Sequence, residues 1–427
     1  MLKSIRKILN KSNNVTRDSY LWNSLNAMLS AAESPVILSV MNRTNGLYDS
    51  GIFSIAFAIS SLMLYLGQYG LRRFQSSDIK EKYSFGEYYA MRFITCGAMM
   101  FASLFYCIYG TLTKDYSAEK FMVIMLICFV RCIQAFSDVV HGRMQQKGRL
   151  DVATRCSAVR YVGEMLSYAV MLIITRDLVF STIACAVTSF VIFMLTSMNA
   201  AVDYCVLKPE FGFDRFKRLL VEGFPLFLSL FLNMYLSNAP KYAIDTYLTE
   251  EVQARYNLIF MPAFVVQLVA HFIFNPILTT YAEVWTKGDI RKLNRLIRRQ
   301  MLVILGLAVL GLTVAATIGI PVLSLLFGVD LSDYKKELCV VMLGGGLLAY
   351  SVFFNTVITI IRLHRTLIVC YGVAAFAAFA LSGYFVRNFG MMGAAGIYTI
   401  IMSVLTVLLG IILFTRLWKE TRRQAVR

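Results

Sequence analysis

The chain is dominated by long apolar stretches separated by short polar connections. A transmembrane α-helix needs roughly 20 consecutive, mainly apolar residues to cross the hydrocarbon core of a bilayer. Twelve stretches reach that length: residues 19–41, 49–71, 87–111, 119–142, 152–175, 178–202, 219–245, 254–281, 300–327, 336–361, 365–387 and 391–415. The pattern predicts an all-α membrane protein with twelve transmembrane helices.

The basic residues of the connections alternate in density along the chain. Every second connection, beginning with the N-terminal segment 1–18, is rich in Lys and Arg, and these connections hold 30 basic residues against 8 in the others. Cytoplasmic loops of membrane proteins carry an excess of Lys and Arg. The alternation predicts that both termini are cytoplasmic, and it supports twelve spans because a missed or false span would disrupt it.

The polar connection "DYCVLKPEFGFDRFKR" follows the sixth predicted span and divides the chain into two halves. Because six is an even number, both halves enter the membrane in the same direction, as parallel repeats do. We therefore expect two parallel six-helix lobes around a central cavity. The predicted parts are an N-terminal lobe at 1–205, a cytoplasmic linker at 206–218 and a C-terminal lobe at 219–427.

A shift of 205 residues places Ser34-Pro35 on Ala239-Pro240, inside the first span of each lobe. Proline removes a helical hydrogen bond and bends the helix. Pro35 and Pro240 are therefore predicted to be paired hinges, with a static kink used for packing as the alternative. The same shift places Lys241, in the stretch "LSNAPKYAID", on Val36, so this lysine is particular to the second lobe.

Composition agrees with a membrane protein, because only 16% of the residues are charged and 58% are hydrophobic. A soluble domain carries roughly 25% charged residues. The net charge of +17 is spread over the connections, which indicates membrane topology and not nucleic-acid binding. The nine cysteines form no CxxC pair, and no catalytic triad, metal motif or cofactor motif is present. We expect no enzyme activity, no metal and no cofactor.

Four basic and four acidic residues inside the predicted spans are of interest, apart from charged residues near span ends such as Glu87, Glu222 and Glu337. A charged side chain at mid-membrane costs about 2.5–3.5 kcal/mol on insertion scales, so it normally faces a cavity or a partner. The residues are Arg92, Arg131, Arg160, Lys241, Glu33, Asp138, Glu164 and Asp245. One interpretation is a cation-lined cavity for a multidentate anion such as diphosphate, which suits arginine. The other is structural ion pairs: Arg160 with Glu164, Lys241 with Asp245, and Arg131 with Asp138.

Two basic segments are amphipathic. The N-terminal "MLKSIRKILNKSNN", with Leu2, Ile5 and Leu9 on one side, predicts a short interfacial helix. The segment "WTKGDIRKLNRLIRRQ" at 285–300 predicts a helix on anionic phospholipid, with an ordinary positive-inside anchor as the alternative. The run Gly344-Gly345-Gly346 lacks the GK[ST] ending of a phosphate loop, so it predicts close helix packing.

The stretches "GLRRFQSSDIKEKYSFGEYYAMRFIT" at 70–95 and "QAFSDVVHGRMQQKGRLDVATRCSAVR" at 134–160 carry a family resemblance. Together with the two six-span lobes, they resemble the Wzx-type polysaccharide flippases of the multidrug/oligosaccharidyl-lipid/polysaccharide exporter superfamily. The resemblance implies translocation of an undecaprenyl-diphosphate-linked oligosaccharide, for O-antigen, capsule or exopolysaccharide, across a bacterial inner membrane. A polysaccharide polymerase is an implied partner.

We expect such a transporter to work by alternating access, with cations contacting the diphosphate and polar side chains contacting the sugars. The expected substrate-binding residues are Arg131, Arg160, Lys241, Arg92, Arg72, Arg73, Gln134, Asn233, Asn238 and Ser30. Coupling to H⁺ or Na⁺ would involve Glu33, Asp138 or Asp245, unless the membrane potential acting on charged cargo suffices. The alternative function is a multidrug cation antiporter of the same superfamily, for which Glu33 is the best acidic candidate. No catalytic arrangement supports a lipid-modifying enzyme.

Overall fold

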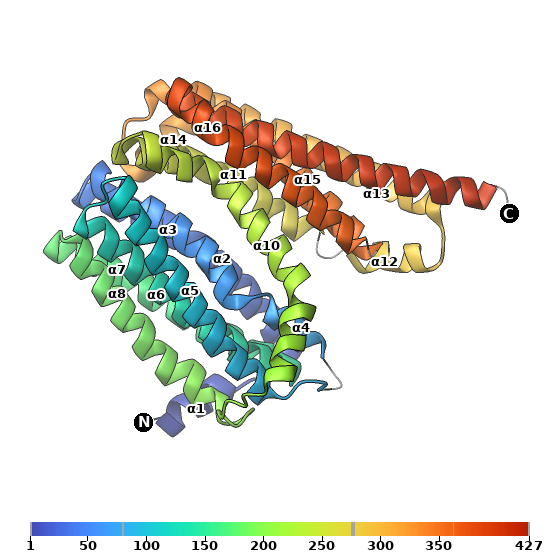
Figure 1. The fold of residues 1–427 in the computed structure, drawn as a ribbon, viewed down its shortest axis with the longest axis horizontal. Helices are drawn as coiled ribbons and strands as arrows, with labels where there is room; N and C mark the ends of the chain where they lie inside the picture. The colour runs from blue at the N-terminus through green and yellow to red at the C-terminus, as the bar shows by residue number, and fades with distance from the viewer. Residues whose placement is uncertain (1, 79–80, 275–277, 362, 426–427) are drawn as a thin grey trace. The chain divides into compact units, whose positions relative to one another are not determined.

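In the computed structural model, which describes residues 2–78, 81–274, 278–361 and 363–425, the regular elements are all helices (Figure 1). They are α1 (Leu2–Asn10), α2 (Val15–Thr44), α3 (Leu47–Gln68), α4 (Leu71–Ser77), α5 (Phe85–Thr113), α6 (Ala118–Gln146), α7 (Leu150–Thr175), α8 (Leu178–Phe193), α9 (Asn199–Ala201), α10 (Phe213–Tyr247), α11 (Glu250–Phe274), α12 (Leu278–Thr286), α13 (Ile290–Val314), α14 (Ile320–Phe327), α15 (Lys335–Ile360) and α16 (His364–Ala425). Short π-helical turns continue α8 into α9 and α13 into α14, and a 3₁₀ turn precedes α15.

Ten helical segments of the described residues are long and apolar enough to cross a membrane. The eleventh and twelfth predicted spans share one of them, because α16 contains both and is interrupted by the non-helical Gly390 (φ 56°, ψ −135°). The eighth predicted span, 254–281, falls on α11 and α12, and its residues 275–277 lie outside the described residues. An all-helical membrane protein is therefore confirmed, while the count of twelve and the side of the termini stay predictions.

The chain forms two compact units, Met1–Phe231 (unit 1) and Leu232–Arg427 (unit 2). The division falls inside α10, so the predicted linker 206–218 and the first part of α10 belong to unit 1. Tyr69 explains part of this assignment. Its ring stacks on Phe227 of α10 with centroids 4.5 Å apart, and its hydroxyl donates to the Leu220 carbonyl at 3.3 Å.

Helix α6 is the centre of unit 1 and packs against α3, α4, α5, α7 and α8, while α2 packs against α7. Gly67 lets α3 approach closely, since a Cβ at this position would lie 2.7 Å from Met99 Sδ of α5 and 3.3 Å from Ala135 Cβ of α6. Local signals fix the helix ends. Ser84 and Glu87 form a reciprocal capping box at the start of α5.

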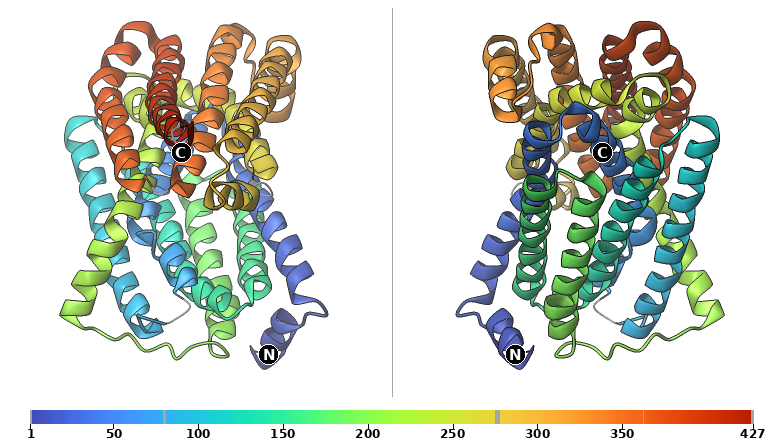
Figure 2. Two further views of the ribbon diagram at one scale, coloured as in Figure 1. Left: turned by 90° about the vertical axis from the view of Figure 1, so that its right-hand side faces the viewer. Right: turned by 90° about the vertical axis from the view of Figure 1, so that its left-hand side faces the viewer.

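The connections that we predicted to lie on one side of the membrane meet at one end of unit 1 (Figure 2). Arg143, in the last turn of α6, and Lys147, directly after the helix, each place a nitrogen 2.9 Å from Glu81 Oε1, in the α4–α5 connection. At the far end of α7, Asn45 donates to the Arg176 carbonyl at 2.9 Å. The predicted alternation of sides is thus visible in unit 1 as two separate ends.

Helix α15 is the centre of unit 2 and packs against α11, α13 and α16. The run Gly344-Gly345-Gly346 allows the neighbouring helices to approach α15 closely. A Cβ at Gly344, Gly345 or Gly346 would lie 2.5 Å from the Tyr398 side chain, 2.9 Å from Ala263 Cβ and 2.9 Å from Ala308 Cβ, respectively. The prediction that these glycines serve helix packing is confirmed.

The basic segment 285–300 is not a separate interfacial helix. Helix α12 ends at Thr286, and α13 begins at Ile290 and runs without a break into the predicted ninth span. Asp289 caps the new helix by accepting a hydrogen bond from the Lys292 amide at 2.9 Å. The contact of this segment with anionic phospholipid stays a prediction.

Candidate functional site

The guanidinium of Arg131, in the middle of α6, is enclosed by three helices of unit 1. Its Nη1 lies 3.1 Å from Glu33 Oε2 of α2 and 2.9 Å from Gln134 Oε1 of α6. Its central carbon lies 4.5 Å from the ring centroid of Phe57 on α3. Arg131 and Glu33 are both buried, so each compensates a charge that would be costly alone inside a membrane.

The contacts continue from α6 to α7 and α8. Gln134 Nε2 donates to the Tyr161 hydroxyl at 3.0 Å, and the Arg160 guanidinium lies 4.7 Å from the centroid of the Tyr161 ring. Arg160 Nη1 lies 2.5 Å from Glu164 Oε1, which also accepts from the Ser189 hydroxyl at 2.5 Å. We call Glu33, Arg131, Gln134, Arg160, Tyr161, Glu164 and Ser189 the α6–α7 network. Its two arginines and two glutamates balance, so its formal charge is zero.

A second cluster surrounds Asp138, further along α6. Arg92 Nη2 of α5 lies 3.2 Å from Asp138 Oδ2, and Arg72 Nη1 of α4 lies 3.4 Å from Oδ1. Arg92 also donates through Nη1 to the Gly67 carbonyl, and Thr95 donates to the same carbonyl at 2.8 Å. The Asp138 carboxylate thus forms ion pairs with two guanidiniums. We call Arg72, Arg92 and Asp138 the Asp138 cluster, and its formal charge is +1.

The predicted pairing of Arg131 with Asp138 is wrong, because each of them finds a partner on a neighbouring helix. Seven residues separate the two along a helix by roughly 10 Å, so they share a face without being adjacent. The predicted pairing of Arg160 with Glu164 is confirmed. These two are four residues apart, a spacing that brings side chains together within one helix.

The remaining predicted residues of unit 1 lie outside both groups. Ser30 on α2 and Arg73 on α4 are exposed. Pro35 lies within α2, which continues past it to Thr44. Tyr161 and Ser189 are members of the network that sequence reasoning missed, because only helix packing brings an ordinary tyrosine and serine next to these charges.

In unit 2, Lys241 is buried and surrounded by aromatic rings of α11. Its Nζ lies 4.8 Å from the centroid of Phe260 and 5.7 Å from that of Phe264, which allows cation–π attraction. Asn238 Nδ2 donates to the Met234 carbonyl at 3.2 Å, so this amide is bound within its own helix. The other predicted residues of this unit are Asn233, which is half-buried, and Pro240 and Asp245, which are buried within α10.

A cavity of about 280 Å³ lies where the 210–219 segment covers the first turns of α5. Its lining includes Glu87, Ile94, Phe211 and Arg215. None of the predicted site residues lines it, although the structure describes all of them.

The buried arginines keep unused hydrogen-bond donors. A guanidinium carries five N–H groups, and in the described part of the chain the Nε atoms of Arg92, Arg131 and Arg160 have no hydrogen-bond partner. Such N–H groups can donate hydrogen bonds to an anionic ligand that reaches them. The Asp138 cluster is the better anion site of the two, because it carries a net positive charge and Arg72 is partly exposed.

Comparisons with known proteins extend the fold assignment. No protein-family model and no curated protein sequence matches the chain. An inward-facing multidrug resistance MATE family transporter of the MOP superfamily matches with a TM-score of 0.65 at 13% identity, over 95% of this chain and 99% of that one. Lipid II flippase MurJ, in an inward closed conformation, matches with a TM-score of 0.70 at 12% identity, over 91% and 86%. Vibrio cholerae MATE transporter VcmN in the bent form matches with a TM-score of 0.60 at 12% identity, over 98% of both chains.

These similarities define the class of the molecule at the level of its fold. The chain is a multi-pass membrane protein with the fold that the MATE transporters and MurJ share. At 12–13% identity the similarity extends to the fold alone.

Proposed function

We propose that the protein is a flippase that moves an undecaprenyl-diphosphate-linked oligosaccharide from the cytoplasmic to the outer leaflet by alternating access. It would serve surface-polysaccharide biosynthesis in a bacterial inner membrane, upstream of a polysaccharide polymerase. The fold supports a transporter. The observation that carries the choice of an anionic substrate is the Asp138 cluster, in which two guanidiniums share one carboxylate.

A diphosphate fits this cluster chemically. Arginine presents paired N–H groups that match phosphate oxygens, and a charge-assisted hydrogen bond is roughly twice as strong as a neutral one. Arg72 is partly exposed and Arg73 is exposed beside it, so both can meet a headgroup at the basic end of unit 1. Ser30, Asn233 and Asn238 are proposed to contact sugar hydroxyls, and Lys241 is proposed to add a cation from unit 2.

The α6–α7 network suggests how substrate binding is linked to a coupling ion. A phosphate that binds Arg131 would take the place of Glu33, which now lies 3.1 Å from it. The released carboxylate would be an uncompensated charge inside the membrane, so it would take up H⁺ or Na⁺. Asp138 could act in the same way when a phosphate binds Arg92, and Asp245 is the corresponding acid that we propose in unit 2.

A multidrug cation antiporter is the alternative, and the pairing of Glu33 argues against it. An organic cation needs an acid whose charge is not already compensated. Glu33 is paired with Arg131 and Glu164 with Arg160, while the net charge of the Asp138 cluster is positive. These charges therefore favour an anionic substrate over a cationic one.

Complementation tests the proposed function. The chain is expressed in bacteria that lack their own polysaccharide flippase but assemble a matched lipid-linked glycan, and surface glycan and drug resistance are measured in the same cells. We expect restored surface glycan without drug resistance. Drug resistance without restored glycan would overturn the proposal.

Substitutions then assign the anion site. Arg92→Gln and Arg72→Gln should lower export at least about tenfold, the effect expected for losing a charged contact of about 1.4 kcal/mol or more. Arg17→Gln, at an exposed position of α2, is the matched control and should leave export unchanged. Export that falls only in proportion to protein abundance would assign the Asp138 cluster to stability alone.

A further inference from the structure

Helix α1 is bound to unit 1 along one side only. Leu9 is buried in an apolar cluster with Val152 and Ala153 of α7 and Ala200 and Ala201 of α9, and Ile5 packs against the same cluster. Ile5 and Leu9 are four residues apart and therefore lie on the same side of the helix. This packing fixes which side of α1 faces the protein.

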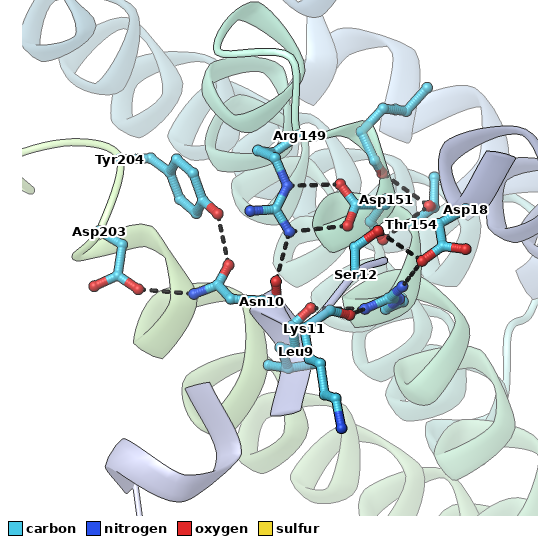
Figure 3. Close-up of polar contacts among 12 residues, drawn as sticks. Leu9, Asn10, Lys11, Ser12, Asp18, Arg149, Asp151, Thr154, Asp203 and Tyr204 are labelled. Atoms are coloured by element: carbon cyan, nitrogen blue, oxygen red, sulfur yellow. Dashed lines mark hydrogen bonds and ion pairs between the residues drawn. The ribbon is translucent and has the colours of Figure 1, made fainter. Parts of the chain in front are cut away.

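Arg149, in the α6–α7 connection, and Arg155, on α7, hold the C-terminal end of α1. Figure 3 shows Arg149 beside Asn10. Arg149 Nη2 donates to the Asn10 carbonyl at 2.8 Å, and Arg155 Nη1 donates to the Leu9 carbonyl at 3.1 Å and to the Lys11 carbonyl. The last carbonyls of a helix lack partners within the helix and form the negative end of its dipole. The two guanidiniums donate hydrogen bonds to these carbonyls and place positive charge at the negative end of the helix dipole.

The polar residues next to this packed side bind residues that follow α9. Arg6 Nη1 lies 2.7 Å from Asp203 Oδ1, and Asn10 Nδ2 donates to Asp203 Oδ2 at 2.8 Å. The Tyr204 hydroxyl donates to Asn10 Oδ1 at 2.5 Å. Figure 3 shows Asn10 between Asp203, Tyr204 and Arg149, so α1 is held in a defined rotation about its own axis.

That rotation leaves a row of lysines on the outer side. Lys3 and Lys7 are four residues apart on α1, and Lys11 directly follows the helix. All three are exposed and have no ion-pair partner among the described residues. Ile8 lies beside the row with an exposed fraction of 71%. The sequence Leu2–Asn10 contains no acidic residue, so the outer side of α1 is basic with one large apolar side chain.

The position of α1 along the chain keeps it close to the start of a candidate membrane span. Residues 11–14 are the whole connection to α2, and four residues span at most roughly 14 Å. Helix α2 is a candidate membrane span, and its exposed Tyr20 and Leu21 lie in its second turn. If α2 crosses the membrane, lipid headgroups are the ligand that we expect near this surface.

We propose that Lys3 and Lys7 of α1, together with Lys11 directly after the helix, bind anionic phospholipid headgroups, with Ile8 inserted between them. Basic residues near an anionic membrane surface gain attraction from its negative potential, and an apolar side chain on the same helix adds buried area. Each lysine contributes about fivefold in affinity, from about 1 kcal/mol per residue. The proposal does not depend on the identity of the transported substrate.

The full-length protein is tested in two kinds of nanodisc, one of phosphatidylcholine and one of two parts phosphatidylcholine to one part phosphatidylglycerol. The rate of acylation of each lysine by a water-soluble ester is measured by mass spectrometry. Lys3, Lys7 and Lys11 should react at least about fivefold more slowly with phosphatidylglycerol present. Lys335 and Lys336, exposed at the start of α15, are the controls for a general surface potential and should change less than about twofold.

Two further arms separate lipid binding from its alternatives. Inorganic phosphate added to phosphatidylcholine nanodiscs should protect none of the three lysines, and protection by phosphate alone would overturn the proposal. In the K3Q/K7Q/K11Q variant, the amides of residues 2–12 should exchange hydrogen at the same rate in both nanodiscs, whereas in the unsubstituted protein they should exchange more slowly with phosphatidylglycerol. Equal slowing of the control lysines, no slowing at α1, or a lipid effect that survives in the variant would each contradict lipid binding by this row.

Discussion

Replacing Glu33 by glutamine removes the charge that compensates Arg131 inside unit 1. The two side chains are 3.1 Å apart and almost fully buried. At this distance, with an effective dielectric constant of about 20, their attraction is about 5 kcal/mol. Part of it offsets the cost of removing both charges from water, but breaking a buried pair leaves one charge uncompensated and typically costs about 3–5 kcal/mol. We expect Glu33→Gln and Arg131→Gln each to destabilise the protein by that amount.

The double variant Glu33→Gln/Arg131→Gln should recover most of this loss. It removes both charges and leaves two amides that can hydrogen-bond to each other, so its stability should lie within about 1–2 kcal/mol of the unsubstituted protein. Unit 1 contains six buried free cysteines, so a thiol-reactive dye reports its thermal unfolding in detergent. For a unit of this size, the single variants should melt about 6–20 °C lower.

The outcome also separates structure from function. If the double variant melts no higher than either single variant, the reasoning from the ion pair is refuted. If it regains the melting temperature but not export, Arg131 acts on the substrate beyond its structural pairing. Arg17→Gln, which changes an exposed arginine of α2, should leave melting temperature and export unchanged.

Further predictions concern packing, pH and the backbone. Gly110→Ala should destabilise unit 1 by about 1–3 kcal/mol, because a Cβ there would lie 2.3 Å from the Tyr116 ring, and an unchanged melting temperature would contradict this close packing. Hydrogen bonds from Lys147, and next from Arg143, lower the pKa of the Glu81 carboxyl below its ordinary 4.5, so their stabilising effect is present above pH 4.5 and disappears as the pH falls through the lowered value. The protection factors of the amides at 143–147, which correct for the slower intrinsic exchange in acid, should therefore fall at acidic pH in the unsubstituted protein, while in Glu81→Gln this fall should be absent. Gly390→Ala should cost about 1–3 kcal/mol, because φ 56° with ψ −135° is almost restricted to glycine, and a melting temperature equal to that of the unsubstituted protein would refute this strain.

Much of the fold could be predicted from sequence because its signals are local. Apolar stretches of membrane length gave the long helices, and the alternation of basic connections gave the two ends of unit 1. The glycine run at 344–346 predicted close packing of α15, since glycine is favoured where helices approach each other. The boundary between the two compact units, between Phe231 and Leu232, was harder to predict from the sequence. It depends on how the first part of α10 packs against residues such as Tyr69, which is distant in sequence.

The candidate site divides in the same way. The sequence alone determined which charges lie within spans, and it determined the pairing of Arg160 with Glu164, because the periodicity of a helix makes that pair adjacent. Only the tertiary structure decided that Arg131 pairs with Glu33, 98 residues away, and that Asp138 is shared by Arg72 and Arg92. The physical reason is that buried charges take the nearest opposite charge in space, and between helices that neighbour is set by packing of α2, α4 and α5 around α6 and α7, which no local spacing encodes.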